Sequence, residues 1–280
     1  MPNVADLNPI HTEQREVTLL FADMRGFTEL AGSLQMDPLV CELLAHVMEC
    51  LAEAVAAHDG FIVDYYGDGL VAMWNAPANQ PAHAELGCSA ALQMLASLPM
   101  VSDEWMNVTQ AELRLGIGVH TGSVQVGNAG STRKVKYGPR GPNVNLASRV
   151  EAATKELRVP FVATQSTIER LTTDFAANRV CRAQMPGLQQ PMNLYVVRNS
   201  TPDEQLTFSW HAYAKALGQF EQGCFEEAAE TLANMDEAIT DVPWRFLRER
   251  VRNELGRTLR RRNSDKLTTL PNSVVTLLTK

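Results

Sequence analysis

Two aspartates stand at positions where a carboxylate could hold metal ions beside a phosphate. Asp23 follows the apolar strand predicted over residues 16–22, so it emerges where a buried strand gives way to a turn. Asp68 lies in Tyr-Gly-Asp-Gly, the sequence of a tight hairpin turn. Carboxylate oxygens are the ligands that Mg²⁺ prefers. Each signal alone is weak, because an aspartate often only caps a helix or makes a turn.

The turn after Asp23 offers backbone amides that could cradle phosphate oxygens. A short glycine turn precedes a predicted helix there, and these amides belong to Arg25, Gly26, Phe27 and Thr28.

A helix predicted from residue 143 carries two further groups suited to phosphate chemistry. Asn145 and Arg149 are four residues apart, so they point from the same helix face. Asparagine can orient a ribose, and arginine can neutralise charge on a transferring phosphoryl group. Together with Asp23 and Asp68, the pair suits in-line attack on a phosphate held by two metal ions.

Composition bounds the protein class. The 280 residues are 45% hydrophobic, which predicts a packed core, and the net charge of −7 argues against broad nucleic-acid binding. No run approaches the roughly 18 apolar residues of a membrane span, and no signal peptide is evident, so we expect a cytoplasmic protein. The five cysteines are scattered without metal-ligand spacing and sit mostly among apolar residues, which predicts buried, reduced thiols.

Strands and helices alternate through the first 200 residues or so, with several hairpins, which predicts an α/β (α+β) fold with a mixed sheet. The predicted strands are 16–22, 61–66, 70–74, 113–121, 123–127, 134–137, 161–163, 180–183 and 193–197. The predicted helices are 28–34, 38–58, 82–98, 143–153 and 165–171, with 101–112 as an irregular connection.

The last third of the chain is predicted to be helical. Two helices over 206–233, broken at Gly223, resemble one tetratricopeptide-like hairpin, and a third spans 244–259. We therefore expect an N-terminal segment (1–15), a catalytic domain (16–198), a helical region (199–262) with a basic run at its end, and a flexible tail (263–280).

The order of the motifs resembles the class III nucleotide cyclase family. Four stretches between about residues 16 and 197 carry the resemblance: Phe-Ala-Asp-Met-Arg-Gly-Phe-Thr, Tyr-Gly-Asp-Gly-Leu-Val-Ala-Met-Trp, Gly-Val-His-Thr-Gly and Asn-Val-Asn-Leu-Ala-Ser-Arg-Val-Glu. The resemblance implies a ferredoxin-like βαββαβ core and a head-to-tail homodimer with two composite active sites.

The resemblance also implies roles for the residues above. Asp23, Asp68 and the Met24 carbonyl of one protomer would bind two Mg²⁺ or Mn²⁺ ions, and Asn145 and Arg149 of the other would contact ribose and triphosphate. A nucleoside triphosphate would then become a 3′,5′-cyclic nucleotide and pyrophosphate. The alternative is a catalytically silent, regulatory cyclase domain.

The base-reading positions depart from the family pattern. Adenylate cyclases of the family carry Lys where this chain has Asp64, and Asp or Thr where it has Gly138. An ionised Asp64 only accepts hydrogen bonds, so the usual adenine contact is missing, whereas the Glu of guanylate cyclases has similar chemistry. The predicted base pocket also includes Phe21, Tyr66 and Arg140.

Bulky groups near this pocket favour a smaller, pyrimidine base. The loop Tyr-Gly-Pro-Arg-Gly-Pro-Asn and the stretch Met-Trp-Asn-Ala-Pro are similar to the stand-alone cyclases of bacterial Pycsar antiphage systems, which make cyclic UMP or cyclic CMP for a partner effector protein. We therefore expect UTP ahead of CTP, with GTP and ATP as alternatives.

The family's usual basic phosphate contact before the last strand is absent, since the chain reads Gln-Met-Pro-Gly over 184–187. The candidate replacements are Arg25, Arg133, Lys134, Lys136 and Arg140.

Overall fold

The central strand of the protein ends at the first of the two aspartates. The computed structural model describes residues 11–33, 38–131, 133–172, 174–186, 190–200, 203–235, 242–262 and 274–277. In it, β1 (His11–Met24) pairs antiparallel with β3 (Gly69–Trp74) on one side and β4 (Leu115–Ser131) on the other. This pairing fixes where Asp23 leaves the sheet.

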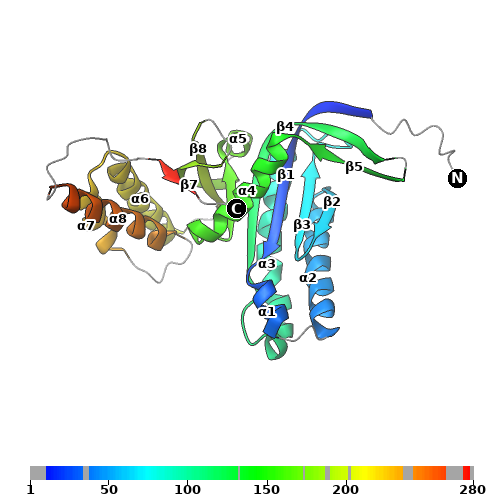
Figure 1. The fold of residues 1–280 in the computed structure, drawn as a ribbon, viewed down its shortest axis with the longest axis horizontal. Helices are drawn as coiled ribbons and strands as arrows, with labels where there is room; N and C mark the ends of the chain where they lie inside the picture. Colours follow the sequence, from blue (N-terminus) through cyan, green and yellow to red (C-terminus); the bar gives the residue numbers. More distant parts are fainter. Residues whose placement is uncertain are drawn as a thin grey trace.

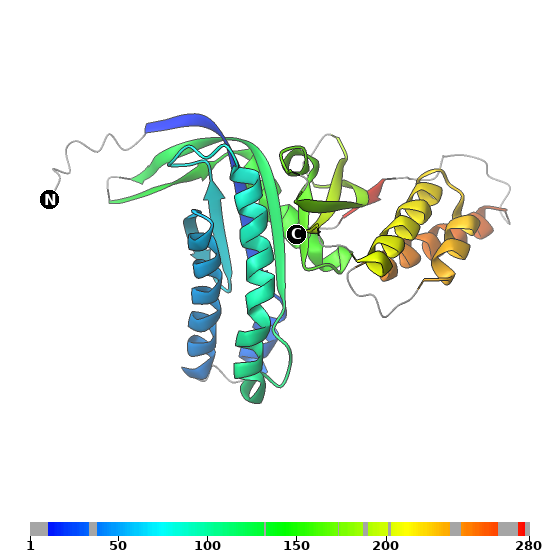
Figure 2. The ribbon, with the colours of Figure 1, turned by 180° about the vertical axis from the view of Figure 1, so that it is seen from behind.

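Both faces of β1 are covered, which explains its nearly unbroken apolar sequence. Leu20 and Ala22 enter the core on one face, and Leu19 and Phe21 enter the core on the other. The covering helices are α2 (Pro38–Ala57) and α3 (His83–Thr109) on the first face and α4 (Pro142–Leu157) on the second (Figure 1). Figure 2 shows α2 and α3 from their own side.

Among the described residues the sheet has nine strands, in the order β2-β3-β1-β4-β6-β8-β7-β9, with β5 paired to β4 off this path. The remaining strands are β2 (Phe61–Tyr66), β5 (Lys134–Arg140), β6 (Phe161–Thr164), β7 (Phe175–Gln184), β8 (Met192–Asn199) and β9 (Val275–Thr276). From β1 to β4 the elements follow the order β1-α1-α2-β2-β3-α3-β4, which is βαββαβ when α1 and α2 are taken as one helical segment, and the strands lie in the order β2-β3-β1-β4. The mixed α/β fold with a ferredoxin-like core is therefore confirmed.

Several predicted boundaries were wrong. The predicted end of the third helix near residue 98 is incorrect, because α3 continues past Pro99 and buries Val101 and Ser102 before it ends at Thr109. The Ser102 hydroxyl accepts a hydrogen bond from the Leu113 amide at 2.9 Å, so the segment predicted as an irregular connection is tied to the core.

The strand predictions also needed correction. The two strands predicted over 113–127 form one long strand, β4, and β5 extends through the predicted loop to Arg140. Residues 11–15, predicted to be loose, extend β1. The predicted helix over 165–171 is the single turn α5 (Gln165–Ile168). Most of the predicted tail over 263–280 lies outside the described residues.

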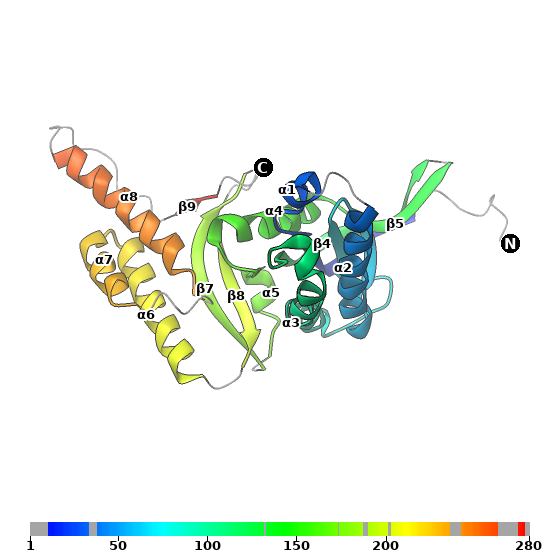
Figure 3. The same ribbon diagram turned by 90° about the horizontal axis from the view of Figure 1, so that it is seen from below.

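The C-terminal helices form the far end of the molecule from α2 (Figures 1 and 3). They are α6 (Glu204–Glu221), α7 (Phe225–Ala233) and α8 (Trp244–Arg262), and Gly223 separates the first two, as predicted. One continuous core joins Val150 and Leu157 of α4 to Trp210 and Tyr213 of α6. The helical region therefore packs on the same hydrophobic core as the sheet.

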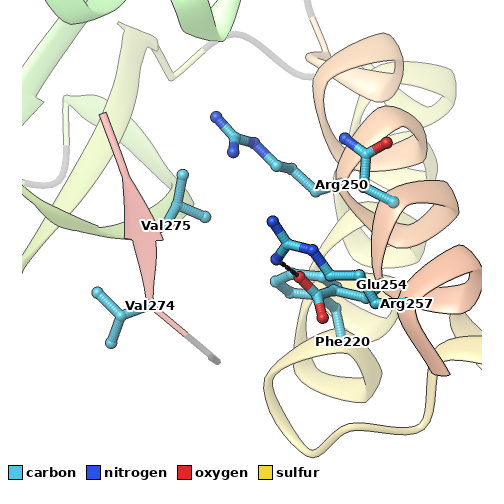
Figure 4. Close-up of a pocket in the computed structure, with 7 residues that line it drawn as sticks. Phe220, Arg250, Glu254, Arg257, Val274 and Val275 are labelled. Atoms are coloured by element: carbon cyan, nitrogen blue, oxygen red, sulfur yellow. Dashed lines mark hydrogen bonds and ion pairs between the residues drawn. The ribbon is translucent and has the colours of Figure 1, made fainter. Parts of the chain in front are cut away.

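A small cavity of about 190 Å³ separates α8 from β9 (Figure 4). Figure 4 shows the Val275 side chain pointing toward α8 across it, with an ion pair between Arg257 and Glu254 on α8.

One buried hydrogen bond lets us test this packing. The Tyr213 hydroxyl donates to the Val180 carbonyl of β7 at 2.9 Å in a fully buried setting. Tyr213→Phe leaves that carbonyl unpaired, so the free energy of unfolding should fall by about 1–3 kcal/mol in urea denaturation. The same change at Tyr65, which is 48% exposed, should have little effect on stability. Equal stability of the two variants would contradict the packing of α6 against β7 through Tyr213.

Among the described helices, α3 is long and apolar enough to cross a membrane, and 44% of its most apolar window is buried inside the protein. Its buried residues include Cys88, Ala91 and Met94, which pack in the core with α2. This is the pattern of a core helix. All five cysteines are free, as predicted, although Cys41 is exposed rather than buried.

Candidate active site

Asp23 and Asp68 meet where β1 ends beside the β2–β3 hairpin. Asp23 lies opposite Gly69 in the sheet register, and the Met24 amide donates to the Asp68 carbonyl at 3.4 Å. Burial and the neighbouring charge of Asp68 raise the pKa of Asp23, and Arg25 opposes this rise. The structure therefore brings the two carboxylates close enough to repel each other.

The residues at this corner fit divalent cations. Two carboxylates that destabilise each other's charge are relieved by a cation between them. No group of three or more acidic, histidine or cysteine side chains suited to a metal occurs among the described residues. Two carboxylates are nevertheless enough for Mg²⁺, which usually keeps waters and substrate phosphates as its other ligands.

The segment predicted to bind phosphate is a glycine turn that leads into α1. Gly26 has φ +74°, a conformation that favours glycine, and its carbonyl accepts from the Leu30 amide at 3.0 Å as α1 (Phe27–Ser33) begins. The first amides of α1 have no partner within the helix. The Arg25 amide, by contrast, donates to the Arg114 carbonyl at 2.7 Å and is already used.

The Arg25 side chain is held between β4 and α4. Its Nη2 atom donates to Oε1 of Glu151 at 2.7 Å. Burial raises the pKa of Glu151 to about 7, and the charges of Asp23 and Asp68 add to this rise, while Arg25 opposes it. Glu151 was not among the predicted site residues. Its position among the apolar residues of the helix predicted over 143–153 could have indicated a buried ion pair, because a buried charge needs a partner.

A broad cleft of about 1240 Å³ opens in front of the aspartates. Asp23, Asp68 and Arg25 line one part of it, and Arg158 and Trp244 line another. The cleft thus runs from the carboxylate pair to the first turn of α8.

Asn145 and Arg149 lie apart from the carboxylates. They occupy the outward face of α4, and neither is among the described residues that line the cleft. Arg149 donates to the Pro186 carbonyl. A single chain therefore does not assemble all four predicted residues into one site.

His120, from the Gly-Val-His-Thr-Gly motif, anchors the start of α4. Burial lowers its pKa to about 4, so the imidazole is neutral near neutral pH. Its Nε2 donates to the Asn143 side-chain oxygen at 3.2 Å, and its Nδ1 accepts from the Thr164 hydroxyl at 2.9 Å. Asn143 precedes Asn145 by two residues, so His120 positions the helix that carries Asn145, a role that the sequence did not reveal.

Asp64, which was predicted to read the base, contacts Lys136, which was predicted as a candidate phosphate contact. Lys136 of β5 forms an ion pair with Asp64, and this contact lowers the pKa of the carboxyl. A register shift in β2 at Val63 precedes Asp64, and such bulges re-aim the following side chains. Asp64 and Lys136 together present an acceptor beside a donor.

The other predicted base-pocket residues lie near this edge of the sheet. The rings of Phe21 and Tyr66 have centroids 6.0 Å apart. A Cβ on Gly138 would lie 3.2 Å from the Val63 side chain, so Val63 closes the space that a larger residue would need.

Arg140 braces the β4–β5 hairpin. Its guanidinium donates to the carbonyls of Gly127, Ala129, Lys136 and Gly138 at 3.3–3.4 Å. Contact of Arg140 with a nucleotide stays a prediction, as does phosphate binding by Arg133 and Lys134.

Comparison with known proteins gives a family. The adenylate and guanylate cyclase catalytic domain family matches residues 10–199. Adenylate cyclase 1 of Rhizobium meliloti is 30% identical over 184 residues, which is 66% of this chain and 28% of that protein. Guanylate cyclase 2G of Mus musculus is 32% identical over 156 residues, 55% of this chain and 14% of that protein. The chain thus spans less than a third of either relative.

Solved structures share the fold. The guanylyl cyclase Cya2 aligns with a TM-score of 0.63 and 28% identity over 70% of this chain and 98% of that one. The adenylyl cyclase CyaB from P. aeruginosa aligns with a TM-score of 0.64 and 24% identity, over 69% of this chain and 99% of that one. The chain therefore belongs to the adenylate and guanylate cyclase catalytic domain family.

Proposed function

We propose that this protein is a nucleotide cyclase that converts a nucleoside triphosphate to its 3′,5′-cyclic monophosphate and pyrophosphate. The observation that carries the proposal is the meeting of Asp23 and Asp68 at the edge of a large cleft, beside the turn that begins α1. We assign this activity to residues 16–198.

The proposed active unit is a head-to-tail homodimer. Asn145 and Arg149 lie outside the cleft of their own chain, so a second copy has to supply them. The exposed apolar side chains Tyr65, Tyr66 and Val135 lie on β2 and β5, where burial against a partner would be favourable. Two-fold pairing would give two equivalent composite sites.

Each residue has a distinct part in the proposed reaction. Asp23, Asp68 and the Met24 carbonyl would hold two Mg²⁺ or Mn²⁺ ions. When bound, these ions would polarise the ribose 3′-hydroxyl and offset the triphosphate charge. Asn145 would orient the ribose, and Arg149 would balance the charge that develops as the 3′-oxygen bonds to the α-phosphorus and pyrophosphate leaves. The hydroxyl proton is released to water.

We propose a pyrimidine substrate, UTP ahead of CTP. Asp64 accepts and Lys136 donates, a pattern complementary to uracil N3–H and O4. Guanine presents the same pattern at N1–H and O6, so size has to separate the two bases. Tyr66 and Phe21 pack together near this edge, and Val63 borders the space beside Gly138, which favours the smaller ring.

Incubation of the purified protein with each of the four nucleoside triphosphates and Mn²⁺ tests both the cyclase activity and the preference for a pyrimidine base. We expect cyclic UMP as the main product and a lesser amount of cyclic CMP, measured by mass spectrometry. Product from GTP or ATP alone would exclude the pyrimidine assignment and leave a guanylate or adenylate cyclase. No product from any of the four would favour a silent regulatory domain.

The cellular role extends this proposal. A cyclic pyrimidine nucleotide would act as a cytoplasmic second messenger in antiphage defence, switching on an effector protein. The helical region over 199–262 would then serve regulation or recruitment, since its core is continuous with that of α4.

A further inference from the structure

The Arg25–Glu151 ion pair joins the two parts of the chain that carry the proposed catalytic groups. Glu151 lies on the inner face of α4 and is only 7% exposed. Besides its 2.7 Å contact with Glu151 Oε1, Arg25 Nη2 lies 3.4 Å from the Glu151 carbonyl oxygen and contacts the Thr154 hydroxyl. The Thr154 hydroxyl also donates to the Glu151 carbonyl at 2.7 Å. The guanidinium is therefore fixed by several contacts from a single helix.

Two glycines of β4 make room for this arrangement. A Cβ on Gly116 would lie 1.6 Å from Nη2 of Arg25, and a Cβ on Gly118 would lie 2.1 Å from the backbone nitrogen of Glu151. Residues two apart in a strand face the same side. The strand is thus shaped to let both α4 and the Arg25 side chain reach its surface.

The Arg25–Glu151 ion pair connects the turn after Asp23 to helix α4, which carries Arg149. Arg25 follows Asp23 by two residues, and Gly116 lies opposite Asp23 in the register of β1 and β4. Glu151 follows Arg149 by two residues on α4. A shift of the ion pair therefore moves the turn that holds Asp23 relative to the helix that holds Arg149.

We propose that Glu151 is a positioning residue that, through Arg25, couples the two active sites of the dimer. This inference rests on the proposed composite sites. In such a dimer, the Asp23 and the Arg149 of one chain serve different sites. The Arg25–Glu151 pair within each chain therefore ties half of one site to half of the other.

Glu151→Gln keeps the side chain's size and one acceptor oxygen but removes its charge. We expect the kcat/KM of cyclic nucleotide formation to fall at least about tenfold, mainly in kcat, because small misplacements of reacting groups have large effects on rate. The matched control is Glu156→Gln, which removes another ion pair of α4, with Arg250 of α8. That variant should keep wild-type kinetics, and equal losses in both variants would overturn the proposal.

A double-mutant cycle tests whether Glu151 acts through Arg25. In an Arg25→Ala background, Glu151→Gln should cause no further loss of kcat/KM, because its partner is already gone. Additive losses would overturn the proposal.

Mixed dimers test the coupling itself. A dimer of an Asp23→Ala chain and an Arg149→Ala chain keeps one intact composite site. Glu151→Gln should lower its turnover when placed in either chain, since each chain's pair supports one half of that site. A loss from only one placement, or from neither, would overturn the coupling.

Hydrogen exchange separates failure of this inference from failure of the proposed function, because it needs no turnover. Glu151→Gln should speed amide exchange in both the turn after Asp23 and α4, and Glu156→Gln should leave the turn unchanged. Unchanged exchange in the turn would overturn the inference even if the wild type makes cyclic nucleotide. If Glu151→Gln fails to fold, Thr154→Val serves instead, because it removes one contact of the Arg25 guanidinium without leaving an unpaired charge. Amide exchange should then also become faster in the turn after Asp23 and in α4, but by less.

Discussion

Replacement of either aspartate, Asp23→Ala or Asp68→Ala, should lower cyclic nucleotide formation by at least about 10³-fold, because each removes one of the two carboxylates proposed to bind the metal ions. The charge on Asp23 is already disfavoured in the fold, since burial and Asp68 raise its pKa. Loss of that carboxylate should therefore leave the free energy of unfolding unchanged or slightly higher. Turnover with Mn²⁺ and urea denaturation of the same preparations measure the two quantities.

The matched control is Asp103→Ala, an exposed aspartate of α3 that lines the same cleft. It should retain wild-type turnover. If Asp23→Ala or Asp68→Ala retains substantial activity while it stays folded, that residue is not a metal ligand.

Mixing two inactive variants should restore activity. Asp23→Ala disables the metal half of a site, and Arg149→Ala disables the half that the other chain supplies. In their mixed dimer one site carries both defects and the other carries neither. With random exchange half of the dimers are mixed, so we expect about a quarter of the wild-type turnover.

A chain that carries both substitutions provides the control. Mixed with wild type, it places one defect in each site of every mixed dimer, so those dimers should be inactive. Wild-type homodimers make up about a quarter of an equal mixture, so about a quarter of the wild-type turnover should remain. About half of the wild-type turnover in that mixture, or no recovery with the two single variants when mixed dimers have formed, would mean that each site belongs to one chain.

The parts of the site that the sequence predicted are those fixed by local chain geometry. Asp23 follows an apolar strand, Asp68 follows a hairpin signal, and Gly26 has the left-handed conformation that its turn requires. Such features depend on a few consecutive residues, so the sequence pattern was sufficient for them.

The parts that the sequence did not predict depend on which elements touch. The partners of Glu151 become visible only when α4 is known to cross β4 above Gly116 and Gly118. The ion pair of Asp64 with Lys136 joins two strands that lie more than 60 residues apart in the sequence. The extension of α3 past Pro99 is a similar case, because burial of Val101 outweighs the local preference of proline to end a helix.

The short strand β9 has a consequence for how the helical region can move. Its residues pair parallel with Ala183 and Gln184 of β7, and Val275 and Leu277 are buried. The three C-terminal helices are thus anchored to one sheet at both ends, through β8 before them and β9 after them, and cannot swing as a domain on a single tether. Release of β9 would expose the hydrogen-bonding edge of β7, which is the kind of edge that an extended peptide from another protein can occupy by strand addition.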